Sequence, residues 1–164
     1  MIEAIVLAGG LGTRLRSTVS DVPKPMAPIN GRPFLDLLMS SLSKKGIKRV
    51  ILSVGYMSEV IEDYFGSEKY GISIDYNVEK NPLGTGGAIY SCLKICNSEG
   101  ILVMNGDSYI SYDHNELIKK WLKYIKPIVV TRETQPSSRY GSIIFEKDKI
   151  KSFTIFNNEK VSGN

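Results

Sequence analysis

Hydrophobic residues follow two patterns that alternate along the chain. Residues 4–7 and 101–104 are short continuous apolar runs, which are typical of strands buried on both faces of a sheet. Residues 34–42 instead carry apolar side chains at helical spacing, and Gly46 stands where a helix ends. The alternation of the two patterns predicts strands separated by helices.

This order of elements indicates an α/β fold with a mixed, mainly parallel sheet, a Rossmann-like three-layer sandwich. The proline-rich segment 23–33 is predicted to form no regular helix. Ser58 is expected to cap its helix, and Gly86 with Gly87 to lead into another. The predicted strands are 4–7, 50–54, 72–76 and 101–104, the helices are 34–45, 58–65, 88–93 and 115–124, and segments 127–131, 141–146 and 150–156 are expected to be extended.

Length and composition predict one domain. The chain has 164 residues, 42% of them hydrophobic, and no composition break, so a single compact domain over 1–164 is expected. The net charge of +4 is scattered, and the basic cluster Lys119, Lys120, Lys123 and Lys126 is interpreted as a solvated helix face, which argues against a nucleic-acid partner. The first apolar run is too short for a signal peptide or a membrane span, so we expect a cytoplasmic protein without a membrane partner.

Three residues that often bind metals receive no role. Cys92 and Cys96 lie four residues apart in a helical pattern and are expected to be packed free thiols. His114, the single histidine, follows Asp113 at the start of a helix, where capping or exposure to solvent is expected.

A glycine-rich loop follows the first predicted strand in the segment LAGGLGTRL, residues 7–15. A Walker loop would need Lys and then Ser or Thr after its last glycine, but Gly12 is followed by Thr13 and Arg14. The dinucleotide spacing G-x-G-x-x-G fails as well, because Leu15 stands at the third glycine position. Glycines still allow backbone N–H groups to approach an anion, and Arg14 adds a forked cation. The loop therefore predicts a polyphosphate site.

The segment NGD, residues 105–107, follows the predicted strand 101–104. Because parallel strands end at one edge of a sheet, Asp107 should lie near the glycine loop. A carboxylate beside phosphates suits Mg²⁺, although Asn-Gly-Asp is also a common turn. We favour Mg²⁺ as the cofactor.

Two further segments allow both a functional and a structural interpretation. Lys24 stands between Pro23 and Pro25, which would hold a catalytic lysine in place or simply form a rigid surface loop. Residues 81–87, NPLGTGG, would give backbone contacts to a base or form a tight turn before a helix.

Five segments follow one another along the chain: LAGGLGTRL, PKPMAPI, Gly55-Tyr56, PLGTGG and NGD. In this order they resemble the motifs of the sugar-1-phosphate nucleotidyltransferases, also called nucleoside diphosphate sugar pyrophosphorylases. The resemblance runs from residue 1 to about residue 155 and implies the nucleotide-diphospho-sugar transferase fold. The segments DVPKPMAPINGRPFL and PLGTGGAI are most similar to the guanylyltransferases that act on D-glycero-D-manno-heptose 1-phosphate, and next to mannose-1-phosphate guanylyltransferases.

The resemblance implies that a sugar 1-phosphate attacks the α-phosphorus of a nucleoside triphosphate, giving a nucleoside diphosphate sugar and pyrophosphate. It implies that Arg14 stabilises the departing pyrophosphate, Lys24 holds both reacting phosphates, and Asp107 carries Mg²⁺. Glu79 would accept hydrogen bonds from guanine, so GTP is the expected triphosphate, with UTP or dTTP as alternatives. The implied nucleotide-binding residues are Leu7, Ala8, Gly9, Gly10, Leu11, Gly12, Thr13, Glu79, Pro82, Gly84 and Thr85, and the implied sugar-binding residues are Asn105, Gly106 and Gly141.

The chain departs from the family pattern near its end. A Glu-Lys pair of the family, which contacts the sugar, has its counterpart in Glu159 and Lys160 only several residues late. The segment in which the family carries a second metal-binding Asp is expected to be absent. A non-catalytic nucleotide-binding module is therefore the alternative to an enzyme, and a homodimer formed through an exposed sheet edge is a further expectation.

Overall fold

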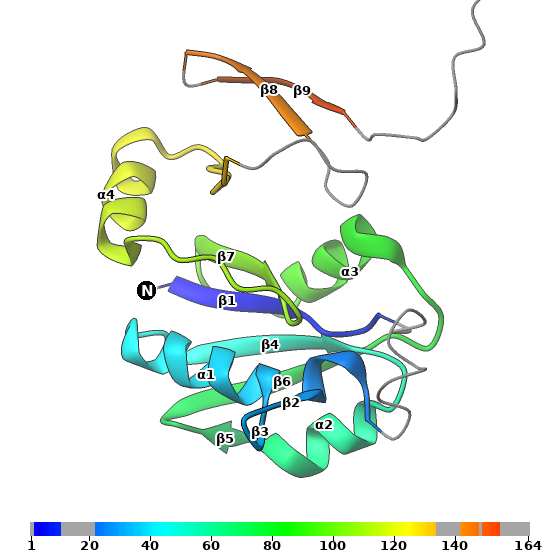
Figure 1. Ribbon diagram of the computed structural model, residues 1–164. Coiled ribbons are helices and arrows are strands. Elements are labelled where there is room, and N and C mark those ends of the chain that lie inside the picture. The colour runs from blue at the N-terminus through cyan, green and yellow to red at the C-terminus, as the bar shows by residue number, and fades with distance from the viewer. Residues whose placement is uncertain (1, 11–21, 134–141, 148, 155–164) are drawn as a thin grey trace, which may run out of the picture. The chain divides into compact units, whose positions relative to one another are not determined.

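The computed structural model describes residues 2–10, 22–133, 142–147 and 149–154 (Figure 1). The chain divides into two compact units, Met1–Asn115 and Glu116–Asn164, and each is described by itself. The single domain over 1–164 stays a prediction.

The first unit is built on a five-stranded sheet with the strand order β5-β6-β4-β1-β7 (Figure 1). β1, β4, β6 and β7 are parallel, and the short β5 pairs antiparallel with β6. The mixed, mainly parallel sheet of the predicted α/β fold is confirmed. The strands are β1 (Ile2–Leu7), β4 (Arg49–Val54), β5 (Glu68–Lys69), β6 (Ile72–Val78) and β7 (Gly100–Asn105).

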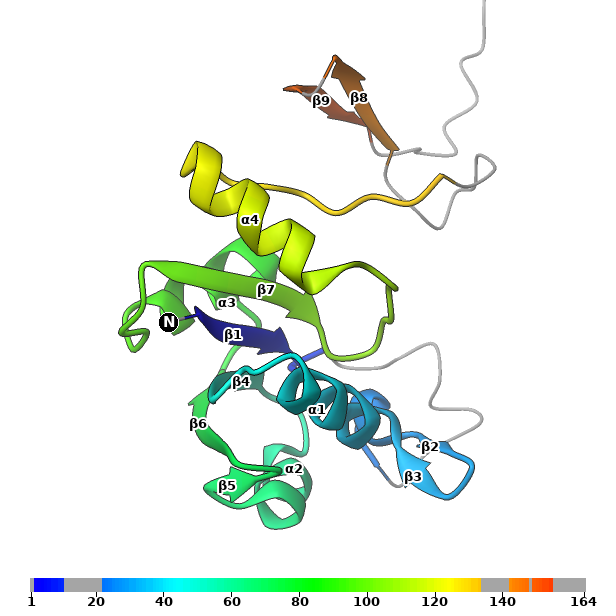
Figure 2. The same ribbon diagram turned by 90° about the vertical axis from the view of Figure 1, so that its left-hand side faces the viewer.

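Helices cover both faces of this sheet (Figure 2). Apolar side chains of α1 (Phe34–Lys44) and α2 (Ser58–Phe65) pack into one core cluster with one face. Cys92 of α3 (Gly84–Leu93) packs against the other face. Between β1 and α1 lie a 3₁₀ turn, η1 (Lys24–Met26), and a hairpin of β2 (Pro28–Ile29) and β3 (Arg32–Pro33).

The strand β1, which lies between β4 and β7, is buried on both faces, as its continuous apolar run predicts. Ala4 and Val6 belong to the cluster with α1 and α2, whereas Ile5 packs with Ile51 and Cys92 on the side of α3. Ala4, Ile5 and Val6 are each 0% exposed. This alternation follows from the two-residue period of a strand, and it fixes the end of β1 between two packed layers.

Two local predictions were wrong in detail, and three short strands were missed. Ser58 is the first residue of α2 rather than its cap; the cap position belongs to Met57, at a φ of 56°, and no side chain bonds there. α3 begins at Gly84, so the two glycines expected before it lie inside the helix. The two-residue strands β2, β3 and β5 were not predicted, because so short a segment carries no readable alternation.

The second unit contains most of α4 (His114–Tyr124), which begins just before the boundary, and an antiparallel hairpin of β8 (Ser142–Glu146) and β9 (Lys149–Thr154). The register of the hairpin shifts between Ile144 and Phe145. Residues 127–133, which include the expected extended segment, form neither a helix nor a strand. Within the described residues, no helix is long and apolar enough to span a membrane.

The two cysteines are free thiols, as expected. Cys92 is buried, the thiol of Cys96 donates to the Cys92 carbonyl oxygen at 3.3 Å, and burial raises the pKa of both thiols. His114 is the first residue of α4, and burial together with the charge of Lys45 lowers its pKa.

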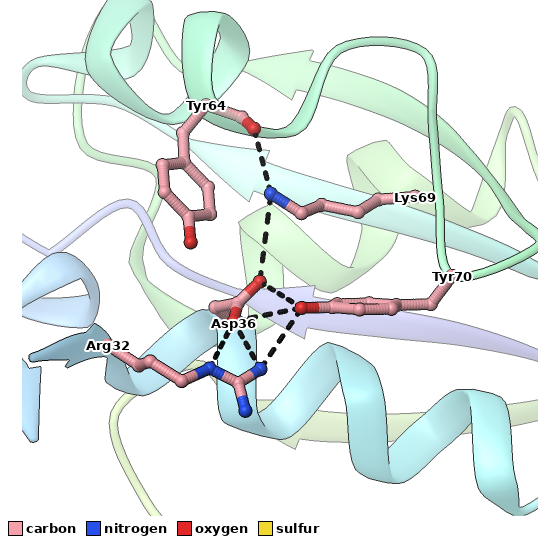
Figure 3. A network of polar contacts seen from close by, with 5 residues as sticks. All are labelled: Arg32, Asp36, Tyr64, Lys69 and Tyr70. Atoms are coloured by element: carbon pink, nitrogen blue, oxygen red, sulfur yellow. Dashed lines mark hydrogen bonds and ion pairs between the residues drawn. The ribbon is translucent and has the colours of Figure 1, made fainter. Parts of the chain in front are cut away.

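A buried carboxylate fastens the β2–β3 hairpin to α1 (Figure 3). Asp36 is 1% exposed and accepts hydrogen bonds from Arg32 Nε at 3.0 Å and from Tyr70 Oη at 2.8 Å. Lys69 Nζ lies 3.7 Å from the same carboxylate and donates to the Tyr64 carbonyl oxygen. Burial works to raise the pKa of Asp36, but these hydrogen bonds and the nearby positive charges outweigh it and hold the pKa below its ordinary value.

We expect Asp36→Asn to lower the free energy of unfolding at pH 7 by about 2 kcal/mol, because Arg32 and Lys69 lose their buried partner charge. The native pKa of Asp36 lies below the unfolded value of about 3.9, so this stabilisation is complete above that value and disappears as pH falls through the native pKa. Urea unfolding at pH 7 and pH 3 measures both effects. The exposed Asp63 provides the control Asp63→Asn. If Asp36→Asn lowered the free energy of unfolding equally at both pH values, the stabilising role given to the ionised Asp36 carboxylate would be contradicted.

Candidate active site

A cavity of about 450 Å³ opens at the carboxyl ends of β1 and β7 and at the start of α3. Its walls come from four separate segments of the first unit, which the sheet topology brings together. The lining residues are Leu7, Ala8, Gly9, Gly10, Lys24, Pro25, Glu79, Pro82, Gly84, Thr85, Ala88, Asn105 and Asp107.

The cavity collects eleven residues that the sequence assigns to a site, and it adds Pro25 and Ala88, which sequence reasoning missed. Pro25 follows Lys24 directly, and Ala88 lies one helical turn after Gly84. Gly106 is placed beside the cavity without lining it. Outside the described residues lie Leu11, Gly12, Thr13, Arg14 and Gly141, together with Glu159 and Lys160.

The register of β1 and β7 explains why the two loops meet. Leu7 pairs with Asn105, and the backbone N–H of Gly106 donates to the Leu7 carbonyl oxygen at 2.8 Å. A Cβ atom at Gly106 would lie only 3.1 Å from that oxygen and 3.3 Å from the Cβ of Ala8. Glycine at position 106 therefore lets the chain after β7 lie close to the end of β1, and Asp107 follows on the wall of the cavity.

Lys24 and Asp107 form an ion pair across 83 residues of sequence, with Lys24 Nζ donating to Asp107 Oδ2. Ser108 Oγ donates to the other carboxylate oxygen at 3.0 Å. Partial burial works to raise the pKa of Asp107, but the bonds from Lys24 and Ser108 outweigh it, so the pKa lies below its usual range. The side chains are 38% and 30% exposed, and both residues line the cavity, so a bound ligand could reach them.

The donor set at Asp107 fits a magnesium ion that is shared with phosphates. Among the described residues, no three His, Cys, Asp or Glu side chains gather into a cluster that could hold a metal by themselves. Mg²⁺ does not need such a cluster, because it is commonly bound by one or two carboxylates, substrate phosphates and water. The ionised, partly exposed carboxylate of Asp107 on the cavity wall meets that requirement.

The carboxylate of Glu79 lies where the glycine loop and the start of α3 converge. Oε1 accepts from the Ser53 hydroxyl at 2.8 Å, and Oε2 accepts from the backbone N–H of Leu83 at 3.1 Å. A Cβ atom at Gly9 would lie 3.1 Å from Oε1, and one at Gly55 would lie 3.0 Å from the Gly9 carbonyl oxygen. These close approaches explain the glycines at positions 9 and 55, which let the loop pack directly on the carboxylate.

The cavity combines features that suit a nucleotide. Gly9 and Gly10 contribute backbone to its wall, Lys24 supplies a positive charge, and Gly84 and Thr85 place the first turn of α3 beside it. Free N–H groups and the positive end of a helix dipole attract anions such as phosphate. Glu79 supplies hydrogen-bond acceptors at the same cavity. Fold and cavity together define an α/β protein whose candidate site lies at the carboxyl ends of parallel strands and is lined by groups that suit a nucleotide.

The comparison with protein families narrows this class. Residues 3–157 match the nucleotidyl transferase family. The chain therefore belongs to the nucleotidyl transferase family, which confirms the resemblance seen in the sequence motifs.

Individual relatives give a more specific likeness. The chain is 47% identical over 153 residues to a D-glycero-α-D-manno-heptose 1-phosphate guanylyltransferase of Campylobacter jejuni, and 42% identical over 153 residues to one of Aneurinibacillus thermoaerophilus. Both alignments cover 93% of this chain. The crystal structure of HddC from Yersinia pseudotuberculosis complexed with GMP-PN is 34% identical, with a TM-score of 0.76 over 94% of this chain and 69% of HddC. The chain spans 66% and 67% of the length of the two guanylyltransferases.

Proposed function

We propose that this chain transfers GMP from GTP to D-glycero-D-manno-heptose 1-phosphate. In this reaction an oxygen of the sugar phosphate forms a bond to the α-phosphorus of GTP, and the bond from that phosphorus to the bridging oxygen of the β-phosphate breaks. Pyrophosphate leaves with the electron pair. Such a transfer needs alignment of the two phosphates and neutralisation of their charge more than a covalent intermediate.

The observation that carries the proposal is the cavity that holds Lys24 and Asp107 together with backbone from residues 7–10 and from the start of α3. Its volume of about 450 Å³ lies within the usual range for small-molecule sites. The identities of 42% and 47% to heptose 1-phosphate guanylyltransferases support the heptose and the guanine in particular. Mannose 1-phosphate with GTP, and another sugar phosphate with UTP or dTTP, are the alternative substrate pairs.

Within the site, Lys24 would contact the α-phosphate and the incoming sugar phosphate, and Pro23 and Pro25 restrict the backbone on either side of it. Asp107 would hold Mg²⁺, which when bound neutralises charge on the phosphates. Arg14, outside the described residues, would stabilise the departing pyrophosphate. Leu11, Gly12 and Thr13 would continue the backbone cradle begun by Gly9 and Gly10.

We propose that the sugar is contacted by Asn105, Gly106 and Gly141. Asn105 lines the cavity beside Asp107, so it could bind a sugar hydroxyl there. Gly106 packs against β1 and would act through its backbone. Gly141 lies outside the described residues, and its sugar contact is proposed from the motif alone.

Glu79 is proposed to read the guanine base. An ionised carboxylate only accepts hydrogen bonds, and guanine presents N1–H and N2–H donors side by side, whereas uracil presents a single N3–H. Pro82, Gly84 and Thr85 line the same part of the cavity and would contact the base through backbone atoms.

We expect Glu79→Gln to lower the ratio of kcat/KM for GTP to kcat/KM for UTP about tenfold. The amide has one acceptor oxygen, yet Ser53 and Leu83 both donate to this side chain, so the substitution leaves an N–H group facing a donor. Steady-state kinetics with both triphosphates measures the ratio. Glu59→Gln on the exposed surface of α2 is the matched control, and an unchanged ratio in Glu79→Gln would remove Glu79 from base selection.

The proposed function is tested by Mg²⁺-dependent pyrophosphate release from GTP, UTP, dTTP, CTP and ATP, each paired with heptose, mannose and glucose 1-phosphates. Release with GTP and the heptose phosphate alone supports the proposal. Release with another pair would reassign the substrates. GTP binding without release from any pair would contradict the enzyme and favour the nucleotide-binding module.

A further inference from the structure

A chain of side-chain hydrogen bonds runs from α3 across two strands to Glu79. Ser91 Oγ donates to Asn77 Oδ1 at 2.8 Å, Asn77 Nδ2 donates to Ser53 Oγ at 3.3 Å, and Ser53 Oγ donates to Glu79 Oε1 at 2.8 Å. Ser91 lies in α3, Asn77 in β6 and Ser53 in β4, and Glu79 directly follows β6. We call this set, Ser91, Asn77, Ser53 and Glu79, the relay.

The relay fixes the direction of every donor in it. Because Asn77 Oδ1 accepts from Ser91, its amide nitrogen faces Ser53. The Ser53 oxygen accepts from that amide, so its own hydrogen is directed at Glu79. The relay therefore ends on a carboxylate oxygen that accepts, and Leu83 N–H fixes the other oxygen at 3.1 Å.

Ser53 is the member of the relay that contacts the site through both its backbone and its side chain. It is 0% exposed, so water does not compete for its hydroxyl, and its backbone carbonyl oxygen accepts from Ala8 N–H at 2.7 Å. Ser53 therefore forms a backbone hydrogen bond with the start of the glycine loop and a side-chain hydrogen bond with the Glu79 carboxylate. A Cβ atom built at Gly9 would lie 3.1 Å from Glu79 Oε1, so the glycine loop and the carboxylate lie close together.

We propose that Ser53 is a positioning residue for base selection, which orients the Glu79 carboxylate so that it favours bases with adjacent N–H donors over bases with one. This inference rests on the proposed function through the role given to Glu79. Without the Ser53 hydroxyl, Oε1 loses a fixed donor and the carboxylate can rotate about its remaining bond to Leu83. The remaining interactions of the triphosphate are left in place, and guanine offers the carboxylate two N–H donors where uracil offers one, so GTP loses more affinity than UTP.

The test is the ratio of the dissociation constants for UTP and GTP, measured by calorimetry on the full chain, in wild type, Ser53→Ala and Asn77→Ala. We expect GTP to bind more tightly to wild type and the ratio to fall about five- to tenfold in Ser53→Ala, the loss of one oriented hydrogen bond. Asn77→Ala should shift the ratio the same way by a smaller factor. Ser73→Ala, at an exposed position of β6, is the control and should leave the ratio unchanged.

If Ser53 had only a structural role, Ser53→Ala would weaken the binding of GTP and UTP by the same factor. That result would overturn the inference. If Ser53→Ala fails to fold by circular dichroism, Asn77→Ala decides, and an unchanged ratio in it would overturn the inference as well. Binding ratios do not depend on turnover. Absence of pyrophosphate release in wild type would therefore refute the proposed function alone, whereas turnover with an unmoved ratio in both variants would refute this inference alone.

Discussion

Asp107→Asn is expected to lower kcat for pyrophosphate release about a thousandfold. The substitution keeps the shape of the side chain but removes the negative charge that would hold Mg²⁺, and a metal ion acting on phosphate oxygens contributes several kcal/mol to transition-state stabilisation. The variant also removes the charge partner of Lys24, whose ammonium group would lose its ionic contact in the free protein. Both effects act on the chemical step.

The fold should survive this substitution. Asp107 follows β7 at the cavity and its side chain is 30% exposed, so the amide can still bond to Ser108 or to water. Thermal unfolding and GTP binding should stay close to wild type, and Asp63→Asn, an exposed position of α2, serves as the control for a lost carboxylate. A kcat within threefold of wild type at saturating Mg²⁺ would exclude Asp107 from the mechanism.

Much of the fold could be predicted because the central strands are buried on both sides. β1 and β4 both contain buried apolar runs, and such runs separated by helices with one apolar face leave few alternatives to a mainly parallel sheet. Segment 127–131 shows the limit of this reasoning. Its β-branched residues favour an extended backbone, but a strand also needs a hydrogen-bonded partner, which local preference does not specify, and none pairs with it among the described residues.

The candidate site was predictable where it follows strand ends and unpredictable where it depends on tertiary contacts. The glycine loop and Asp107 each come directly after an apolar run, so the sheet rule placed both at one edge. The bond from Ser53 to Glu79 joins residues 26 positions apart on neighbouring elements. Ser53 interrupts the apolar run of β4, and a polar residue in so buried a strand was the one available signal that its hydroxyl must have a partner.

Gly106 shows why a motif alone does not give the physical reason for a residue. The NGD sequence suggests that each of its three residues contacts a ligand, yet a Cβ atom at Gly106 would also lie only 3.1 to 3.3 Å from atoms of Val6, Leu7 and Ala8. Packing therefore favours glycine there, and Asn105 and Asp107 on either side of it line the cavity. The sequence does not separate these reasons, because close approach to a ligand and close approach to a neighbouring strand favour the same residue.

Lys24→Ala is expected to lower kcat several hundredfold and to raise KM for the sugar 1-phosphate. Lys24 would contact both reacting phosphates, so its ammonium group contributes to binding the acceptor and, more strongly, to stabilising charge as the new bond forms. Removing one such donor typically costs a hundredfold to a thousandfold in rate. Initial-rate kinetics with each substrate varied in turn separates the two effects, and Lys48→Ala, an exposed lysine just before β4 at the opposite end of the strands, is the control.

Lys24→Arg tests whether Lys24 acts through its positive charge alone or also through the exact position of that charge. The prolines on both sides fix where the side chain starts, and the ammonium group reaches Asp107 across the cavity mouth. A guanidinium group keeps the charge but is larger and planar, so it cannot occupy the same point between two phosphates. We therefore expect Lys24→Arg to recover the affinity for the sugar phosphate more fully than kcat. Full recovery of both would mean that Lys24 acts only through its charge, and no loss in Lys24→Ala would remove it from the site.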